Sequence, residues 1–362
     1  MLDAVKALLS GASVENVPTR RPSHVAGIKA RGASNLPLPA RDLIDLAPYR
    51  KAWKDARAKF SLNLVASRGC PFRCNWCAKP IFGDSYQLRP AKDVAEEMRI
   101  LKDECGAEHL WFADDIFGLN RHWLEELAQA VEALKCAIPF KIQARADLLM
   151  PESARALKRA GCTEVWMGVE SGSQKILDAM DKGLRVEEVV SAREHLKSEG
   201  IRGCYFLQLG YPGEHWEDIQ KTIALVRETR PDDIGISFSY PLPNTRFYAR
   251  VREELGTKRN WSDSEDLCVM FKGSYTDRFY RAIRDALHAE VLSWESKAPT
   301  TADANMLREL WRVVESLEAV SQNEDATQLP RISCGSRSTS FAAESHFVSL
   351  QSVVAGAGEI NE

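Results

Sequence analysis

Three cysteines crowd into one short segment, CPFRCNWC, as Cys70, Cys74 and Cys77. Thiolates are soft ligands that favour zinc or iron–sulfur clusters. A structural zinc site requires a fourth cysteine or a histidine pair. The chain has no second CxxC motif, and its seven histidines are scattered along the sequence. Three thiolates on a four-iron cluster leave one iron open, which is typical of chemistry on a bound small molecule. The spacing therefore favours a catalytic [4Fe-4S] cluster over zinc or buried thiols.

Six short apolar runs alternate with helical stretches, which predicts a parallel sheet with right-handed crossovers. The predicted strands are 61–66, 109–113, 140–144, 165–169, 204–209 and 234–238. The helices between them carry apolar stripes of period 3.6: Val94, Met98 and Leu101; Leu124, Leu127, Val131 and Leu134; Ile219, Ile223 and Val226. The cysteines follow the first strand, at the edge where parallel sheets build their sites.

The third strand indicates how this sheet is curved. Its alternation places Lys141, Gln143 and Arg145 on one face. A doubly wound sheet buries both faces of its central strands, whereas a barrel that does not close can point polar groups into a lumen. We therefore predict an α/β fold that is a partial (β/α)6 TIM-type barrel with a C-terminal helical extension.

The chain divides into four predicted parts. Residues 1–58 are an N-terminal helix, at Leu2 to Leu9, and a linker rich in Pro, Arg, Gly and Ser. Residues 59–252 are the core barrel. Residues 253–325 are a helical extension expected to cover an end or the open side of the sheet, with two stripes: Phe279, Ile283 and Leu287; Met306, Leu310, Val313 and Leu317. Residues 326–362 are expected to be a poorly ordered tail.

Composition narrows the function classes. The chain has 362 residues, a net charge of -3 and a pI near 6.2, so its overall field attracts neither nucleic acid nor an anionic membrane. It shows no secretory h-region and no apolar run of membrane-spanning length. Nine cysteines, three of them crowded, suit a reducing cytoplasm better than a disulfide framework. The other six lack ligand spacing and are expected to be buried small hydrophobes: Cys105, Cys136, Cys162, Cys204, Cys268 and Cys334.

The segment CPFRCNWC after the first strand resembles the radical S-adenosylmethionine (SAM) superfamily. That family has the spacing C-x3-C-x2-C with an aromatic residue before the last cysteine, a position that Trp76 occupies. The resemblance implies that the amino and carboxylate groups of SAM chelate the open iron. An electron from the cluster then cleaves the sulfonium to give methionine and a 5'-deoxyadenosyl radical, which abstracts hydrogen from the substrate.

The ends of the second and third strands match the family's SAM site. Asp114 and Asp115 stand where the family has a carboxylate that accepts from the SAM amino group, although Asp is equally suited to cap the next helix. Arg145 can contact the SAM carboxylate or pair with Asp147. Both interpretations of each position stay open.

The later strand ends continue the match. Glu170, in GVESGS, lies at the family's ribose contact, and a carboxylate can accept from two hydroxyls. The segment QLGYPGE resembles the adenine contact through Gly210, Pro212 and Gly213, although turn chemistry alone selects such residues, and Glu214 can simply favour the start of the next helix. The loop FSYPLPNT begins near Ser239, which we assign to the cofactor site. It has Asn244 where relatives have Gly, a mild departure because Asn tolerates left-handed angles.

The segments LPLPARDLIDLAPYRKAW, GVESGSQKILDAMDKG and LGYPGE resemble the cobalamin-associated branch of the superfamily. That branch includes methyltransferases and the anaerobic magnesium-protoporphyrin monomethyl ester cyclase. Its members carry a cobalamin domain ahead of the linker, of which this chain has at most the final helix. A shortened gene, a separately encoded cobalamin domain and a cobalamin-free enzyme all fit.

The resemblance implies C–H activation on a small or medium organic substrate, with cobalamin-linked methyl transfer first and oxidative cyclisation of a tetrapyrrole-like substrate second. It also implies a low-potential electron donor of the flavodoxin or ferredoxin type. Substrate can enter near Trp261, Asp263, Asp266 and Tyr275, although a surface turn explains these equally well. A non-catalytic iron–sulfur electron carrier is the alternative and predicts no SAM binding. A methylthio-transferring or tRNA-modifying enzyme would want a second cluster or a basic domain, and neither is apparent.

Overall fold

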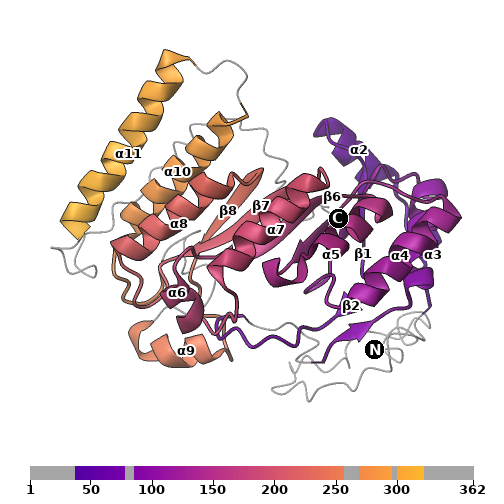
Figure 1. The fold of residues 1–362 in the computed structure, drawn as a ribbon, viewed down its shortest axis with the longest axis horizontal. Helices are drawn as coiled ribbons and strands as arrows, with labels where there is room; N and C mark the ends of the chain where they lie inside the picture. Colours follow the sequence, from indigo (N-terminus) through magenta and orange to yellow (C-terminus); the bar gives the residue numbers. More distant parts are fainter. Residues whose placement is uncertain (1–36, 78–84, 257–268, 296–299, 322–362) are drawn as a thin grey trace, which may run out of the picture.

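The computed structural model describes residues 37–77, 85–256, 269–295 and 300–321. Six parallel strands form one sheet in the order β1-β4-β5-β6-β7-β8, surrounded by helices (Figure 1). The strands are β1 Ser61–Leu64, β4 His109–Phe112, β5 Phe140–Ala144, β6 Cys162–Glu170, β7 Arg202–Leu209 and β8 Asp233–Phe238. Because β1 and β8 are both edges, this sheet is a partial barrel. The predicted fold class and all six predicted strands are confirmed, with β6 longer than expected.

The two faces of the sheet differ sharply in burial. One face carries apolar side chains that are almost wholly buried, such as Phe112, Ile142 and Met167. The other face is less uniformly buried: β5 alternates between buried and half-buried residues along its length, whereas Trp166 and Gln208 of this face are buried. Lys141 and Gln143 lie on this second face, as predicted. The helices therefore cover one side, and polar groups remain on the inner side.

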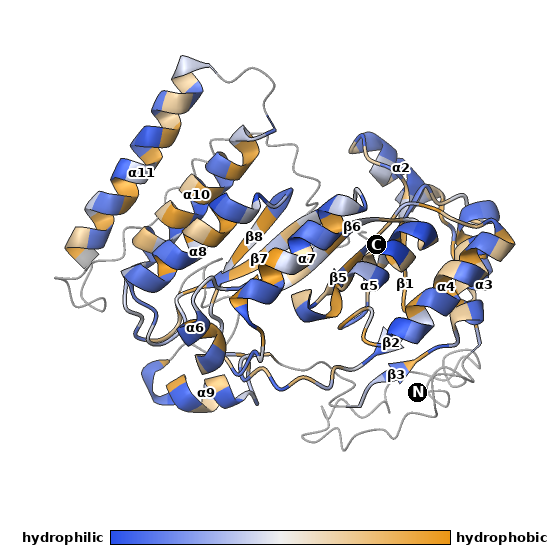
Figure 2. Ribbon diagram, viewed as in Figure 1, coloured by the Kyte–Doolittle hydropathy of each residue, from blue (hydrophilic) through white to orange (hydrophobic). Residues whose placement is uncertain are grey.

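The helices of the described chain follow the predicted crossovers. They are α2 Ala47–Asp55, α3 Ala91–Asp103, α4 Arg121–Leu134, α5 Pro151–Ala160, α6 Gln174–Ala179, α7 Val186–Ser198, α8 Trp216–Thr229, α9 Arg246–Val251, α10 Asp277–Ser293 and α11 Thr301–Ser321, with short 3-10 turns η3 Arg41–Leu43, η4 Ala146–Leu148 and η5 Arg252–Glu254. Most alternate between hydrophobic and hydrophilic residues (Figure 2). Side-chain caps start several of them; Asn120, for example, accepts from the Trp123 N–H at the start of α4. None of the described helices is long and apolar enough to cross a membrane.

Two elements lie where the sequence predicted none. The antiparallel pair β2 Ser67–Arg68 and β3 Gln87–Leu88 flanks the cysteine segment. Helix α2 lies within the stretch predicted as linker, and it is tied to the barrel because Arg50 donates to the carbonyls of Cys105 and Gly106 and lies 4.4 Å from the centre of the Phe60 ring. The predicted helix at Leu2 to Leu9 and the tail at 326–362 lie outside the described residues.

The C-terminal helices extend the helical layer. Tyr280 of α10 packs on Phe238 of β8, 5.6 Å between ring centres, and Phe238 belongs to the buried face of the sheet. Helix α10 therefore packs on β8, the strand at one open edge of the sheet. Helix α11 lies beside α10 (Figure 1). Its predicted stripe was partly wrong, because Met306 and Val313 are exposed whereas Val314 is fully buried.

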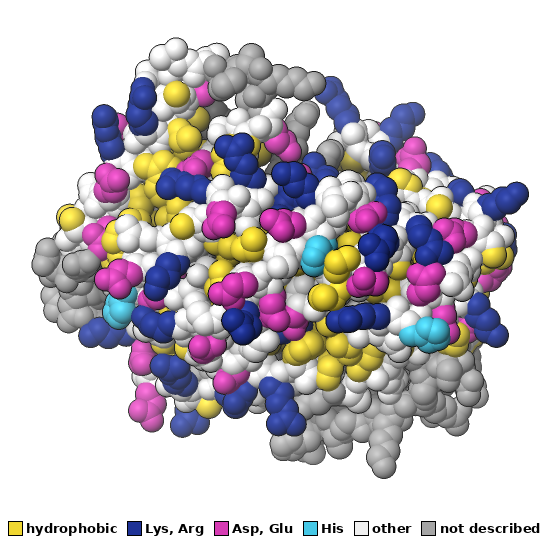
Figure 3. All heavy atoms as spheres, viewed as in Figure 1, with side chains coloured by type: hydrophobic (Ala, Val, Ile, Leu, Met, Phe, Trp, Pro, Cys, Tyr) yellow, Lys and Arg dark blue, Asp and Glu magenta, His cyan; other side chains and the backbone are white. Residues whose placement is uncertain are grey.

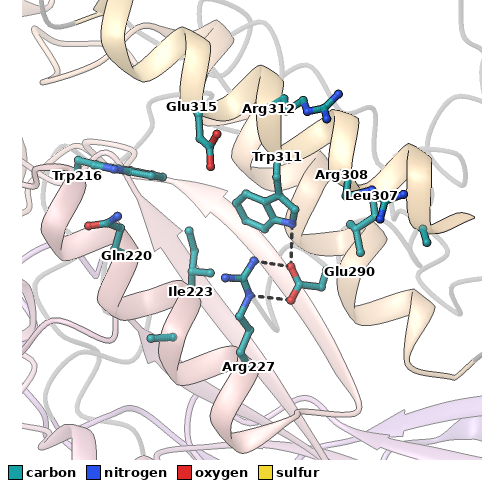
Figure 4. Close-up of a pocket in the computed structure, with 12 residues that line it drawn as sticks. Trp216, Gln220, Ile223, Arg227, Glu290, Leu307, Arg308, Trp311, Arg312 and Glu315 are labelled. Carbon is teal, nitrogen blue, oxygen red and sulfur yellow. Dashed lines mark hydrogen bonds and ion pairs between the residues drawn. The ribbon is translucent and has the colours of Figure 1, made fainter.

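Helix α11 is attached to the barrel through one carboxylate. Glu290 of α10 accepts two hydrogen bonds from the Arg227 guanidinium, at 2.7 and 2.8 Å, and a third from the Trp311 indole at 2.8 Å (Figure 4). Arg227 also lies 4.8 Å from the centre of the Trp311 ring. These contacts link α8, α10 and α11, and Glu290 is only 12% exposed.

Replacing Glu290 should loosen this junction. We expect Glu290→Gln to lower the free energy of unfolding in urea by about 1–2 kcal/mol, because the amide loses charge-assisted bonds to Arg227 and Trp311. The matched control is Glu309→Gln on α11. Glu309 and its partner Arg312 are both exposed, so the free energy of unfolding should change little. Equal losses in the two variants would contradict the assignment.

Candidate functional site

The segment that carries the cysteines leaves the sheet after β1, and two carboxylates from the end of β4 hold its start. Asp114 accepts hydrogen bonds from the backbone N–H of Ala66 at 3.1 Å and from the N–H and hydroxyl of Ser67. Asp115 accepts from the Gly69 N–H at 2.8 Å. Because Gly69 directly precedes Cys70, this Asp pair positions the segment relative to the sheet.

These bonds exclude one of the two interpretations of Asp114, the helix cap. It does not cap the following helix, since Asn120 does so. Its carboxylate is 4% exposed, and this burial raises its pKa to about 7, although the hydrogen bonds from Ser67 and Ala66 oppose the rise. The backbone before the cysteines therefore donates to the same Asp114 carboxylate that the resemblance assigns to the SAM amino group.

A residue that sequence reasoning missed anchors the other end of the segment. Asn75, between Cys74 and Trp76, donates from its amide to the Ala179 carbonyl at 2.7 Å and to Asp181 at 2.9 Å. Its side-chain oxygen accepts from the Tyr211 hydroxyl at 2.8 Å. Its backbone N–H donates to Met180 and its carbonyl accepts from Phe247. No local sequence pattern indicates this role, because the partners of Asn75 lie more than a hundred residues away in the chain.

A cavity of about 340 Å³ lies beside the cysteines, lined by Cys70, Cys77, Trp111, Ala113, Asp114, Asp115 and Gln143. Cys70, Cys74 and Cys77 are each half-buried. Among the described residues, no three His, Cys, Asp or Glu side chains converge closely enough to hold a single metal ion. Two of the three soft ligands thus face one cavity from one anchored segment, a donor set that fits an iron–sulfur cluster larger than one ion.

Arg145 lies at the end of β5, and its guanidinium is almost fully used by the protein. It donates to both oxygens of Asp147 and to the carbonyls of Lys182 and Gly183, at 2.7 to 3.4 Å. It also stacks on Phe72 of the cysteine segment, 3.9 Å from the ring centre. These contacts favour the interpretation in which Arg145 pairs with Asp147 and supports the cysteine segment.

Glu170 ends β6 in a left-handed backbone conformation, with φ of +64°. Its carboxylate is 5% exposed and pairs with the Lys182 ammonium at 2.8 Å. A side chain at Gly168 would come within 2.9 Å of both partners, so this glycine leaves room for the pair. Lys182 also lies 5.9 Å from the centre of the Trp76 ring. The sequence did not indicate Lys182, which brings Trp76 and Glu170 to one place.

The predicted glycine-rich contact forms a closed turn. Gly210 and Gly213 have φ of +77° and +88°, which glycine adopts without strain, and Pro212 lies between them. Glu214 is fully buried and accepts from the Gly210 N–H at 2.6 Å, while its other oxygen has no partner. Its side chain therefore closes the turn and does not serve the helix start, which carries Glu217 and Asp218.

Ser239 and Asn244 follow β8. Ser239 is 1% exposed, and its hydroxyl has no hydrogen-bond partner among the described residues. On the neighbouring strand, the amide oxygen of Gln208 is likewise buried and unpartnered. Asn244 has φ of +69°, which confirms that it takes a left-handed angle. Two unsatisfied polar atoms thus remain near the carboxyl ends of β7 and β8, where a ligand can pair with them.

The remaining predicted residues differ in outcome: three cysteines are buried as expected, Cys105 is less buried than expected, and Tyr275 does not lie in a surface turn. Cys136, Cys162 and Cys204 are buried as predicted, and burial raises the pKa of all three thiols, that of Cys162 to about 12. Cys105 is half-buried. Tyr275 is buried and its hydroxyl accepts from the Trp216 N–H. Cys268, Cys334, Trp261, Asp263 and Asp266 lie outside the described residues.

A larger hollow, about 950 Å³, lies between α8, α10 and α11 and is separate from the cysteines. Trp216 and Ile223 point into it from α8, and Leu307 and Trp311 from α11 (Figure 4). Hydrophobic side chains gather on the surface in this region (Figure 3). Among the charged residues that line it, Arg227 pairs with Glu290 between α8 and α10, and Arg312 pairs with Glu309 on α11. We assign no chemistry to it.

Asn75 should prove important for the cysteine segment. Asn75→Ala removes hydrogen bonds to Ala179, Asp181 and Tyr211, so we expect the free energy of unfolding in urea to fall by about 2–3 kcal/mol. Tyr211→Phe keeps the ring on Phe247 and loses only the hydroxyl, and it should cost about 1 kcal/mol. An Asn75→Ala variant as stable as the unmodified protein would show that the anchor contributes nothing.

Glu214 should make stability depend on pH. Burial raises its pKa to about 8, so the folded chain keeps a proton that the unfolded chain releases above about pH 4.5. Stability should therefore fall as pH rises from about 4.5 to 8, by about 4–5 kcal/mol at most, and then level off. Glu214→Gln retains an acceptor for Gly210 and cannot titrate. Urea unfolding across this pH range should show a smaller fall for the Gln variant; parallel curves would contradict the prediction.

Comparison with known proteins adds the family context. The profile of the Radical SAM superfamily matches residues 64–226. An uncharacterised methyltransferase of Pyrococcus horikoshii is 27% identical over 64% of this chain and 50% of its own length. The anaerobic magnesium-protoporphyrin IX monomethyl ester cyclase of Rubrivivax gelatinosus is 27% identical over 55% of this chain and 36% of its own length.

One solved structure shares the fold. It is the radical S-adenosylmethionine methyltransferase TsrM of Kitasatospora setae, with cobalamin and a [4Fe-4S] cluster bound. The TM-score is 0.52 at 21% identity, over 64% of this chain and 44% of that one. This chain spans half or less of the length of each of these three proteins.

Proposed function

We propose that the protein is a radical SAM enzyme that uses a [4Fe-4S] cluster and SAM to activate a C–H bond of an organic substrate, because residues 64–226 match the profile of the Radical SAM superfamily. The observation that carries this proposal is the cysteine segment itself. One segment that follows the carboxyl end of a strand in the parallel sheet carries three half-buried thiols. Hydrogen bonds hold both ends of this segment in place. The methyltransferase and cyclase relatives agree with an enzyme.

Cys70, Cys74 and Cys77 would hold the cluster, which when bound supplies the electron that cleaves SAM to methionine and a 5'-deoxyadenosyl radical. Asp114, Asp115 and Arg145 support the segment through the contacts described above. Asp114 and Asp115 also line the cavity beside Cys70 and Cys77, where a carboxylate oxygen can accept from the SAM amino group in addition to its backbone donors. Arg145 pairs with Asp147 and supports the segment, which differs from the direct contact with the SAM carboxylate that the resemblance implies.

SAM would lie against the ends of β6, β7 and β8. Glu170 can accept hydrogen bonds from the ribose hydroxyls if its carboxylate shares or breaks the bond to the Lys182 ammonium. Trp76 lies beside Lys182. The turn of Gly210, Pro212 and Gly213 presents backbone for adenine. The unpartnered Ser239 hydroxyl is a ready donor or acceptor for the nucleotide.

Methyl transfer is the reaction we favour, because one similar relative is an uncharacterised methyltransferase and the matched structure is a methyltransferase with bound cobalamin. Cobalamin would then come from a further domain or a separate protein. Oxidative cyclisation is the second candidate, favoured by the likeness to the protoporphyrin ester cyclase. Either reaction needs a low-potential electron donor of the flavodoxin or ferredoxin type.

Anaerobic reconstitution tests the proposal. The full chain should bind about four irons, and reduction with SAM present should release 5'-deoxyadenosine. Replacing Cys74 by Ala should abolish both. Glu170→Gln should weaken SAM binding about tenfold or more and leave the iron content unchanged, with the exposed Glu187→Gln as the matched control.

Two outcomes would contradict the proposal. Iron retention without any SAM cleavage would favour a non-catalytic electron carrier. Loss of iron in Glu170→Gln would mean that Glu170 supports the fold of the site and does not contact SAM.

A further inference from the structure

The hollow of about 950 Å³ between α8, α10 and α11 is a groove with two helical walls. Trp216 of α8 points into it from one wall, and Leu307 and Trp311 of α11 point into it from the other (Figure 4). Helix α10 contacts both walls: its Phe279 ring lies 5.8 Å from the Trp216 ring, and its Glu290 joins Trp311 to α8. Three helices thus surround a space in which a fourth helix can pack.

The groove carries a small surplus of positive charge. Its lining includes three basic and two acidic residues: Arg227, Arg308, Arg312, Glu290 and Glu315. Arg227 and Glu290 neutralise each other through two hydrogen bonds. The surplus therefore lies on α11, where Arg308 and Arg312 are both exposed. An occupant that is apolar on one side and acidic beside that side fits this groove best.

The segment that follows α11 carries a matching sequence. Helix α11 ends at Ser321, and residues 322–362 follow it in the chain. Four of their apolar residues recur at intervals of four, three and four positions: Ala343, Phe347, Leu350 and Val354. That spacing is typical of one face of a helix. Residues 338–362 also contain three Glu and no Lys or Arg, so this stretch is acidic.

The connection to α11 favours binding within one molecule. The chain between Ser321 and Ala343 can span about 70 Å when extended, whereas α11 is only about 30 Å long. The apolar residues can therefore reach any part of the groove. A tether of this kind gives an effective concentration on the order of 1 mM. A helix this short is marginal alone, which agrees with a tail expected to be poorly ordered until it binds.

We propose that residues 340–354 bind in this groove as an amphipathic helix, which completes a group of four helices with α8, α10 and α11. The apolar face of the segment covers Trp216 and Trp311, and Glu344 beside that face lies toward the arginines of α11. Binding removes apolar surface of both partners from water, and the charges favour this occupant over a basic one. The groove is separate from the cysteines, so the inference does not depend on the proposed function.

Hydrogen exchange of the full chain, followed by mass spectrometry, tests the proposal. A synthetic peptide of residues 340–354 gives the exchange rate of the segment when it is free. In the unmodified protein, we expect the amides of residues 343–354 to exchange at least about tenfold more slowly than in the peptide, because helical hydrogen bonds protect them. Exchange in β5, β6 and β7 reports on the fold of the barrel and should be the same in every variant below.

Two pairs of variants test the two sides of the contact. Leu350→Glu places a charge in the apolar face of the segment and should return residues 343–354 to the peptide rate. Ser352→Glu adds the same charge on the opposite face and should leave their exchange slow. Ala304→Glu places a charge in the groove and should also return the segment to the peptide rate. Its control is Ala302→Glu, because Ala302 is exposed on α11 and does not line the groove.

Three outcomes would overturn the proposal. The first is exchange at the peptide rate in the unmodified protein, which would leave the groove for another partner. The second is an equal effect of the two variants within either pair. The third is slow exchange that disappears when the protein is diluted, because the occupant would then come from a second copy of the chain and not from the tail of the same molecule.

Discussion

The cysteine segment depends on being held at both ends by side chains from other parts of the chain. Backbone N–H groups of Ala66, Ser67 and Gly69 would otherwise be left unpaired at the edge of the sheet, and Asp114 and Asp115 accept their hydrogen bonds. Beyond the second cysteine, Asn75 joins the segment to the turn after α6 and to Tyr211. Between these anchors, the thiols occupy a restricted volume. A site that must bind a cluster and a ligand together gains from such preorganisation, because less ordering remains to be done on binding.

Burial of charge near this segment follows a consistent rule. Arg145 and the Glu170–Lys182 pair are almost fully buried, and each charge is matched by an opposite charge or by several carbonyls. Removing one partner of such a pair leaves a buried unpaired charge and costs more than the pair contributes. Around the same strand ends, Ser239 and Gln208 are buried and yet unsatisfied. Satisfied charges support the scaffold, whereas unsatisfied neutral groups mark the places where a ligand can complete the hydrogen bonding.

The asymmetry of the sheet explains how one fold meets both needs. Apolar side chains on the outer face pack under the helices and supply the stability of the barrel. The inner face contributes less to that packing, so it can carry polar side chains such as Lys141, Gln143 and His109. Helices α10 and α11 add to the covered side, with Glu290 linking them to α8. The inner face thus stays available for a substrate.

The sequence by itself determined the elements with strong local patterns. The six strands, the alternation of Lys141 and Gln143, the close spacing of the three cysteines and the left-handed Asn244 all follow from residues within a few positions of each other. Tertiary structure alone decided which distant groups meet. Lys182 joins Glu170, Asn75 joins Tyr211, Asp114 turns to the backbone of Ala66 and Ser67, and Val314 of α11 is buried in place of Val313. The physical reason is that periodicity is a property of a short segment, whereas hydrogen-bond partners and burial depend on contacts between segments that lie far apart in the chain.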